Sequence, residues 1–271
     1  MNYARLASGF LFAAMVGAAH AQPVTLAPHR AVYDLKLLST ASDKAPSAAT
    51  GRIAFDFSGN ACEGYVQSLR QTTEIQPDEG PTRLSDMKST TFEDGDAKNF
   101  RFRLETRSDT GRAENVDGKA AKSGDDSFSV SLSKPRLLKV DLARTVLFPT
   151  EHMKHIIEAA RAGKTIVQAK VYDGSETGEK VYDTTTIIGR PIAAAPTEEA
   201  AKIPQLQGLR RWPVAVSYFE EGGKDASPSY VLSFDLYENG VSRALKLDYG
   251  SFVLSGEMTK LEMLPVKNCA K

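Results

Sequence analysis

The chain has 271 residues, and its 34 lysines and arginines balance 34 aspartates and glutamates, so its formal net charge at pH 7 is zero. A balanced surface does not attract nucleic acid or anionic membranes by bulk electrostatics, so we expect no nucleic-acid partner. Beyond residue 21 there is no apolar run of about 18 residues, the minimum for a membrane-spanning helix. The composition therefore predicts a mature protein without a transmembrane segment that is large enough to form its own core.

Residues 1–21 have the pattern of a secretory signal peptide. Arg5 supplies a positive start, residues 6–19 form a short apolar run, and Ala19-His20-Ala21 is an A-x-A cleavage site. No cysteine directly follows this site, so a lipid-modified lipoprotein is not expected. We predict an exported protein whose mature part, residues 22–271, forms a single domain, because no stretch has the composition of an interdomain linker.

The first half of the mature chain alternates apolar and polar residues with a period of two. Such segments recur at roughly 8–12-residue spacing, around residues 31–37, 52–57, 65–75, 83–92, 100–105 and 127–132. Turn signals separate them at Glu93-Asp94-Gly95, Asp109-Thr110-Gly111 and Asp117-Gly118. The pattern predicts half-buried antiparallel strands in a sandwich, a barrel or a related curled sheet.

One segment breaks this period. Residues 150–162 carry apolar side chains at helical spacing, namely Met153, Ile156, Ile157 and Ala160. Pro149 precedes the segment, Thr150 can cap it, and Gly163 can end it. We predict a helix of about three turns that plugs or covers the apolar face of the sheet.

Strands resume in the second half. Lys170-Val171-Tyr172-Asp173 recurs as Lys180-Val181-Tyr182-Asp183 across a glycine-bearing segment, which predicts a hairpin. Residues 192–205 are rich in alanine and proline and predict a surface loop with a turn of helix at 197–202. Asn239-Gly240 is the strongest short hairpin signal. Further strands are predicted at 214–219, 230–236, 245–249, 252–254 and 258–264.

The chain contains two cysteines, Cys62 and Cys269. An even pair in an exported protein predicts a disulfide, and two buried free thiols are the alternative. We place Cys62 on an early strand that follows a turn at 58–60, and Cys269 in the terminal tail. The bond would then bring the last strand next to the first part of the sheet. Catalytic redox chemistry is not expected, because the chain has no C-x-x-C motif.

Histidines provide the first candidates for chemistry. His152 and His155 are three residues apart on the predicted helix, so we expect them to share a face. They could serve a hydrolase with a nearby carboxylate or contact a ligand, and packing or surface roles are the alternative. A metal site would need more ligands, and the chain has no His-Glu-x-x-His motif and no Cys/His cluster. Complete nucleophile and phosphate-loop motifs are also missing, so we predict no catalytic residues, no metal and no cofactor.

Two further features could contact a partner. The densest basic group comprises Arg101, Arg103, Arg107 and Arg112, interleaved with Glu105, Asp109 and Glu114. This group is either a solvated, salt-bridged face or a contact surface for an anionic envelope component. Trp212 follows two arginines and could anchor a partner, since Trp and Arg are frequent hot spots, while core packing is the alternative. The candidate partner contacts are Arg101, Arg103, Trp212 and His152.

Several short motifs occur in a fixed order along the chain. They are the signal sequence, Cys62-Glu63-Gly64-Tyr65, Phe148-Pro149-Thr150-Glu151-His152, Tyr172-Asp173-Gly174-Ser175, Ile188-Gly189, and a closing segment from Tyr249-Gly250 through Leu264-Pro265 to Cys269. In this order they resemble the EipB family of cell-envelope integrity proteins over nearly the whole mature chain. The resemblance implies a periplasmic protein of Gram-negative alphaproteobacteria that maintains the envelope without an established enzymatic activity. It also implies a disulfide between Cys62 and Cys269.

The resemblance further implies a mainly β fold. A single, strongly curved antiparallel sheet, called a β-spiral, would wrap around one central helix and resemble the lipoprotein carriers LolA and LolB in shape. We therefore expect a non-enzymatic periplasmic protein that supports envelope integrity by binding an envelope lipid, a lipoprotein or a periplasmic protein. One alternative is a lipoprotein or lipid carrier of the LolA/LolB type, which needs a dry groove large enough for an acyl chain. A further alternative is a hydrolase that uses His152 or His155 in an open cleft.

Overall fold

The computed structural model describes residues 22–41, 45–109, 111, 113–124, 127–142, 145–221, 227–266 and 269. The predicted signal peptide, residues 1–21, lies outside the described residues. No helix within the described part of the chain is long and apolar enough to cross a membrane.

Within the described residues, fourteen strands and one α-helix make up the regular structure, apart from two short 3-10 turns. In chain order the strands are β1 (His29–Thr40), β2 (Ala48–Asn60), β3 (Gly64–Gln76), β4 (Arg83–Glu93), β5 (Asn99–Ser108), β6 (Glu114–Lys122), β7 (Phe128–Lys134), β8 (Leu138–Leu142), β9 (Ile166–Val171), β10 (Tyr182–Ile188), β11 (Arg211–Glu220), β12 (Tyr230–Tyr237), β13 (Ser242–Asp248) and β14 (Phe252–Met263). The helix, α1 (Pro149–Arg161), lies between β8 and β9 in the chain.

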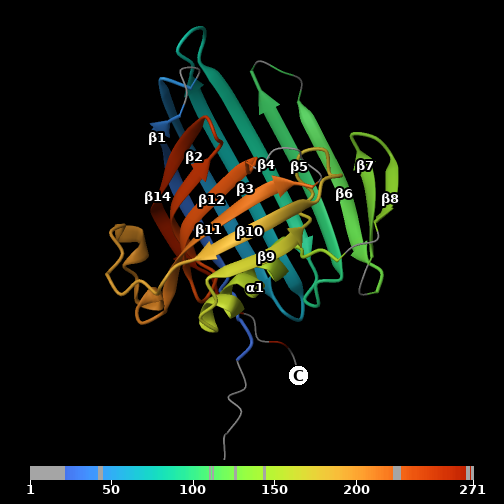
Figure 1. Ribbon diagram of the computed structural model, residues 1–271, viewed down its shortest axis with the longest axis vertical. Helices are drawn as coiled ribbons and strands as arrows, with labels where there is room; N and C mark the ends of the chain where they lie inside the picture. The colour runs from blue at the N-terminus through green and yellow to red at the C-terminus, as the bar shows by residue number, and fades with distance from the viewer. Residues whose placement is uncertain are drawn as a thin grey trace, which may run out of the picture.

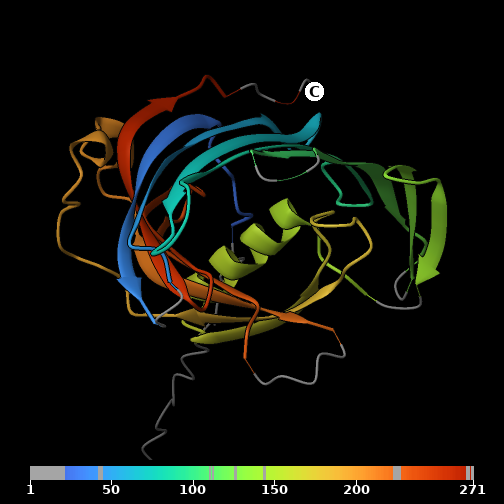
Figure 2. The ribbon, with the colours of Figure 1, turned by 90° about the horizontal axis from the view of Figure 1, so that it is seen from above.

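All fourteen strands belong to one antiparallel sheet with the order β8-β7-β6-β5-β4-β3-β2-β1-β14-β13-β12-β11-β10-β9. Neighbours in this sheet are also neighbours along the chain, except where β1 pairs with β14. The sheet curls strongly, and α1 lies inside the curl (Figures 1 and 2). The prediction of a mainly β fold, with one curved antiparallel sheet around a central helix, is confirmed.

The two faces of the sheet differ as the period of two predicts. On β1, Ala31, Tyr33 and Leu35 point inward and are buried. The outer face instead carries charged pairs between directly opposite residues, such as Arg30 with Asp56 on β2. The inner face therefore forms the core and the outer face meets water.

Two predicted turns lie within strands instead: residues 58–60 form the end of β2, and the other is in β6. Asp117-Gly118 is not a turn but lies inside β6, where the register with β7 shifts between the two residues. A Cβ on Gly118 would come within 2.7 Å of the side chains of Leu132 and Phe102. The glycine is therefore explained by close packing beneath the strand rather than by a change of chain direction. The strands β6 and β8 were not predicted, although Leu138, Val140 and Leu142 alternate with polar residues in β8.

The predicted hairpins and the predicted loop are confirmed. In the 170–183 repeat, Val171 pairs with Tyr182 as β9 meets β10, and Asn239-Gly240 lies between β12 and β13. The alanine- and proline-rich loop contains the short 3-10 turns Glu199–Ala201 and Pro204–Leu206.

This loop also fills the opening where β13 and β14 diverge. There the carboxylate of Glu198 accepts the N–H groups of Met258 and Ala244, at 2.8 and 3.3 Å, and pairs with the buried Arg243.

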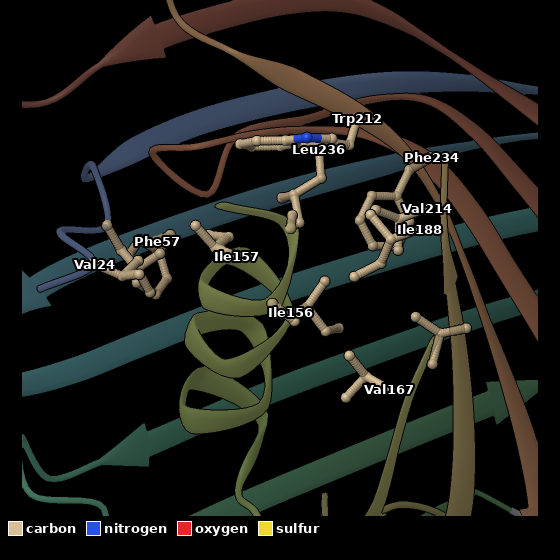
Figure 3. Packing of buried hydrophobic residues seen from close by; sticks show 14 of the residues in the cluster. Val24, Phe57, Ile156, Ile157, Val167, Ile188, Trp212, Val214, Phe234 and Leu236 are labelled. Atoms are coloured by element: carbon tan, nitrogen blue, oxygen red, sulfur yellow. The ribbon is translucent and has the colours of Figure 1, made fainter. Parts of the chain in front are cut away.

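The helix packs as an internal plug. Its inner side presents Ile156 and Ile157 to a cluster on the facing strands that includes Trp212, Val214 and Leu236 (Figure 3). It ends as predicted, because Gly163 adopts a φ of +73° and its N–H bonds the carbonyl of Ala160, while the N–H of Lys164 bonds Ala159. One of the three core clusters therefore lies between α1 and the concave face of the sheet.

Candidate functional site

The N-terminal end of α1 is held by a carboxylate from the sheet. Glu93, the last residue of β4, accepts the backbone N–H groups of Thr150 at 2.7 Å and Glu151 at 2.8 Å. These groups have no partner within the helix, and a negative charge at this end is favoured by the helix dipole. Thr150 therefore does not cap the helix as predicted: it lies inside the first turn, and Phe148 occupies the cap position.

Glu93 itself is buried, with 2% of its surface exposed. Burial raises the pKa of its carboxyl group to about 7, against the opposing effect of the two backbone N–H groups. The sequence pattern had assigned Glu93 to a turn, but in the structure it belongs to β4 and points inward beside Tyr65 and Phe100 in the register. Sequence analysis missed this residue because the acidic Glu93-Asp94-Gly95 segment has the composition of a turn.

Two more contacts attach the same end of the helix. The Lys122 ammonium, on β6, pairs with the Glu151 carboxylate, which also accepts the N–H of Phe148 at 3.2 Å. On the other side, the Gln67 side chain of β3 donates a hydrogen bond of 3.0 Å to the hydroxyl of Thr150. Three neighbouring regions of the sheet therefore fix the first turn of α1.

A cavity of about 190 Å³ lies beside this end of the helix, inside the curl. Most of its wall is apolar and comes from both sides of the sheet and from α1, including Phe55, Phe57, Ile156, Val216, Leu232 and Phe234. A smaller number of polar side chains also line it, namely His29, Gln67, Thr150, His152 and Asp173. An apolar pocket with a few converging polar groups is the usual form of a ligand site.

The pKa shifts of His152, His29 and Asp173, which line this cavity, are all in the direction of the neutral form. Burial, together with the nearby His155, lowers the pKa of His152 to about 4. Burial also lowers the pKa of His29 and raises that of Asp173. Since charge is costly in this environment, the cavity suits an uncharged or apolar group.

The histidines do not form a catalytic pair. His152 is buried against the cavity, whereas His155, although near it, is exposed. The Nε2 atom of His152 makes no hydrogen bond to any described residue. A general base needs a partner that orients it and a nucleophile within reach, and this geometry provides neither at Nε2. Within the described residues there is also no group of three or more His, Cys, Asp or Glu side chains that could hold a metal ion.

The two candidate arginines have different partners in the structure. Arg101 and Arg103 both lie on the outer face of β5 and line a groove of about 550 Å³. Arg103 is bound to Glu105, with its Nη2 at 2.8 Å from the carboxylate. Arg101 instead stacks on the ring of Phe92, with 5.1 Å between its Cζ atom and the ring centroid.

Trp212 lines neither the cavity beside α1 nor the groove on the outer face. Only 2% of its surface is exposed, and it packs in the cluster around α1 (Figure 3). This position agrees with the alternative of core packing, and its indole is not available to a partner in this conformation.

The cysteines form a disulfide, with 5.8 Å between their Cα atoms. Cys62 does not lie on a strand as predicted; it is in the exposed turn between β2 and β3, where Asn60 Oδ1 accepts its N–H at 2.8 Å. Cys269 follows β14, which pairs with β1. The bond therefore connects the β2–β3 turn to the end of β14 across β1.

Comparisons with known proteins agree with this architecture. The family model described as EipB-like matches residues 20–265. The chain belongs to the EipB-like family. It is 38% identical to the cell envelope integrity protein EipB of Brucella abortus (strain 2308), over 97% of this chain and 96% of the relative. A crystal structure of a β-barrel-like protein from Brucella abortus, also 38% identical, matches with a TM-score of 0.82 over 89% of this chain and 100% of that chain.

Membership of the EipB-like family connects the chain with the integrity of the cell envelope. The family is named for this role and is not known as a family of enzymes. The role in the envelope must therefore be explained by the curled sheet, the internal helix and the cavity beside the helix.

Proposed function

We propose that this protein is exported to the periplasm and supports envelope integrity as a non-enzymatic binding protein. Its ligand or partner is an envelope lipid, a lipoprotein or another periplasmic protein. The observation that carries the proposal is the mostly apolar cavity of about 190 Å³ beside α1, with walls from both sides of the sheet. The name of the Brucella relative supports the link with the envelope.

The size of the cavity limits what it accepts. Sites for drug-sized ligands span about 300–1,000 Å³, so a smaller volume suits the end of one acyl chain or one apolar side chain of a partner. Charged groups are disfavoured there, because His152 and Asp173 themselves are shifted toward their neutral forms. A larger ligand would require the first turn of α1 to leave Glu93 and Gln67.

The carrier alternative of the LolA/LolB type is less well supported. It needs a dry groove for an acyl chain, whereas α1 and its core cluster occupy the interior of the curl. The hydrolase alternative has no supporting contact at His152 Nε2. We therefore favour a binding protein over both.

The experiment compares two tryptophan substitutions. Leu232 lines the cavity and is partly buried, whereas Leu84, at the start of β4, is 53% exposed. Leu232→Trp should fill the cavity, and Leu84→Trp is the matched control. Each protein is purified from the periplasm, and bound lipids and proteins are identified by mass spectrometry.

We expect a specific lipid or protein to accompany the wild type and the control but not Leu232→Trp. The cavity variant should also fail to restore envelope integrity in cells that lack the gene. Wild-type protein without any bound component, or equal retention by both variants, would contradict the proposal.

A further inference from the structure

The outer face of the sheet usually neutralises its arginines. Arg30 on β1 pairs with Asp56 on β2 at 2.6 Å, and Arg52 on β2 pairs with Asp34 on β1 at 2.8 Å. In each case the acid lies directly opposite the arginine in the neighbouring strand. On this part of the outer face, each arginine therefore has an acid directly opposite it.

One row of residues across the outer face departs from this pattern. Reading from β3 to β8, the directly opposite residues are Val66, Phe92, Arg101, Lys119, Ser131 and Lys139. The row contains three cations and no acid. Among the described residues, Arg101, Lys119 and Lys139 form no ion pair, and all three are exposed. The labels of β4 to β8 show how these strands follow one another (Figure 1).

Arg101 and Lys119 are the central pair of this row. They lie directly opposite each other on β5 and β6, and like charges in this position destabilise a sheet. Neighbouring strands are about 4.8 Å apart, so both cations can reach one small anion placed above the row. A bound anion would turn an unfavourable pair into a favourable one.

The surroundings of Arg101 prepare it for binding. Its guanidinium lies over the Phe92 ring, and this contact restricts the side chain. Arg101, Lys119, Phe92, Val66 and Ser131 all line the groove of about 550 Å³ on this face. The site therefore combines a guanidinium, an ammonium and a hydroxyl-bearing residue in a recess with apolar side chains, which Arg103 and Asp117 also line.

We propose that this row is a binding site for a phosphate group carried by a small organic molecule or a lipid headgroup. Arg offers a planar fork of donors that matches phosphate, and Lys and Ser supply a point charge and a further donor. The apolar side chains Val66 and Phe92 would accommodate the organic part of the ligand. Arg103 is not part of the site, because Glu105 binds it and Asp117 lies directly opposite.

The proposal goes beyond the interior cavity and uses different residues, so each can fail without the other. The first test titrates the full mature protein with sn-glycerol 3-phosphate and follows binding by calorimetry at low and at physiological salt. Arg101→Gln and Lys119→Gln are the test variants. Arg30→Gln and Arg52→Gln remove one cation each from neutralised pairs on the same face and are the controls.

We expect each test variant to bind glycerol phosphate at least tenfold more weakly, while both controls stay within twofold of the wild type. In the absence of ligand, Lys119→Gln should not lower the melting temperature, since it relieves repulsion with Arg101. Equal weakening in the controls would show a general charge effect and overturn the proposal.

The second test distinguishes the two sources of phosphate. Flotation is measured with vesicles of phosphatidylcholine alone and with vesicles containing phosphatidylglycerol in addition. Binding to the phosphatidylglycerol vesicles that Arg101→Gln abolishes assigns the site to a lipid headgroup, whereas binding of glycerol phosphate alone assigns it to a soluble ester. No binding to either probe, or binding only to a polyglutamate peptide, would overturn the assignment of phosphate.

Discussion

The carboxylate of Glu93, at the end of β4, accepts a hydrogen bond of 2.7 Å from the backbone N–H of Thr150 in the first turn of α1. The two residues are 57 positions apart in the chain. Within the helix, the Glu151 side chain accepts the N–H of Phe148, whereas the N–H groups of Thr150 and Glu151 take their acceptor from the sheet. This contact holds the first turn of α1 against the sheet.

Replacement of Glu93 by alanine should destabilise the protein. It would leave two N–H groups, those of Thr150 and Glu151, without their acceptor, and a buried unsatisfied group costs about 1–3 kcal/mol. Chemical denaturation should show a loss of this size for Glu93→Ala, while the exposed Glu74→Ala should stay within about 0.5 kcal/mol. A loss in Glu93→Ala no larger than in Glu74→Ala would show that the cap is not needed.

Stability should depend on pH through His152 and Glu93, in opposite directions. The pKa of His152 is lowered from 6.5 to about 4 by burial, so its contribution is complete above pH 6.5 and is lost as the pH falls toward 4. The pKa of Glu93 is raised from 4.5 to about 7, so its contribution is complete below pH 4.5 and is lost as the pH rises toward 7.

Urea denaturation at pH 5 and pH 7 separates the two groups. Relative to the wild type, His152→Leu should gain about 2 kcal/mol on moving from pH 7 to 5, and Glu93→Gln should gain about 2 kcal/mol on moving from pH 5 to 7. In a variant with both substitutions the two gains should nearly cancel. The same pH dependence in all four proteins would rule out the assignment.

The disulfide should stabilise the pairing of β1 with β14. Within the described part of the chain, this is the one ladder between strands that are not consecutive, and the bond spans 207 positions. Chain entropy gives an upper limit of about 5 kcal/mol for a loop of this length. Cys62→Ser and Cys269→Ser should therefore melt well below the wild type, and reductant should lower the melting temperature of the wild type alone. Identical melting with and without reductant would contradict this.

Gly118 should tolerate no side chain. In Gly118→Ala the new methyl group would lie 2.7 Å from Leu132 and Phe102, and overpacking of this kind costs about 1–3 kcal/mol. A methyl group added at Gly111 would meet nothing within 4 Å, so Gly111→Ala is the control and should have little effect. Denaturation midpoints give both values, and two equal midpoints would argue against the packing explanation.

Local sequence patterns were sufficient to predict most of the strands and the helix. Alternation defined β1 to β5, and helical spacing with Pro149 and Gly163 located α1. Composition gave wrong predictions where acidic residues and glycine, which are common in turns, have another role in the structure. Asp117-Gly118 and Glu93-Asp94-Gly95 both have turn composition, yet the first lies within β6 and the second begins with a buried helix cap.

The candidate site was accessible to the sequence only in part. Arg101 and His152 were named as candidate contacts and Asp173 appeared only in a motif, but Lys119 was not named, because nothing nearby in the sequence relates it to Arg101. Arg101 lies opposite Lys119 through strand register, and His152 and Asp173 line the same cavity. Both relationships arise between distant segments.

The sequence alone determined the sheet-rich architecture, the single helix and the cysteine pair, because these depend on periodicity and on composition, which are properties of neighbouring residues. The tertiary structure decided which acid caps the helix, that Arg101 lies opposite Phe92 and Lys119 rather than an acid, and how much space is left inside the curl. Those outcomes depend on how the sheet curls and on which residues face each other across its strands. Both are contacts between distant segments, which local sequence patterns do not specify.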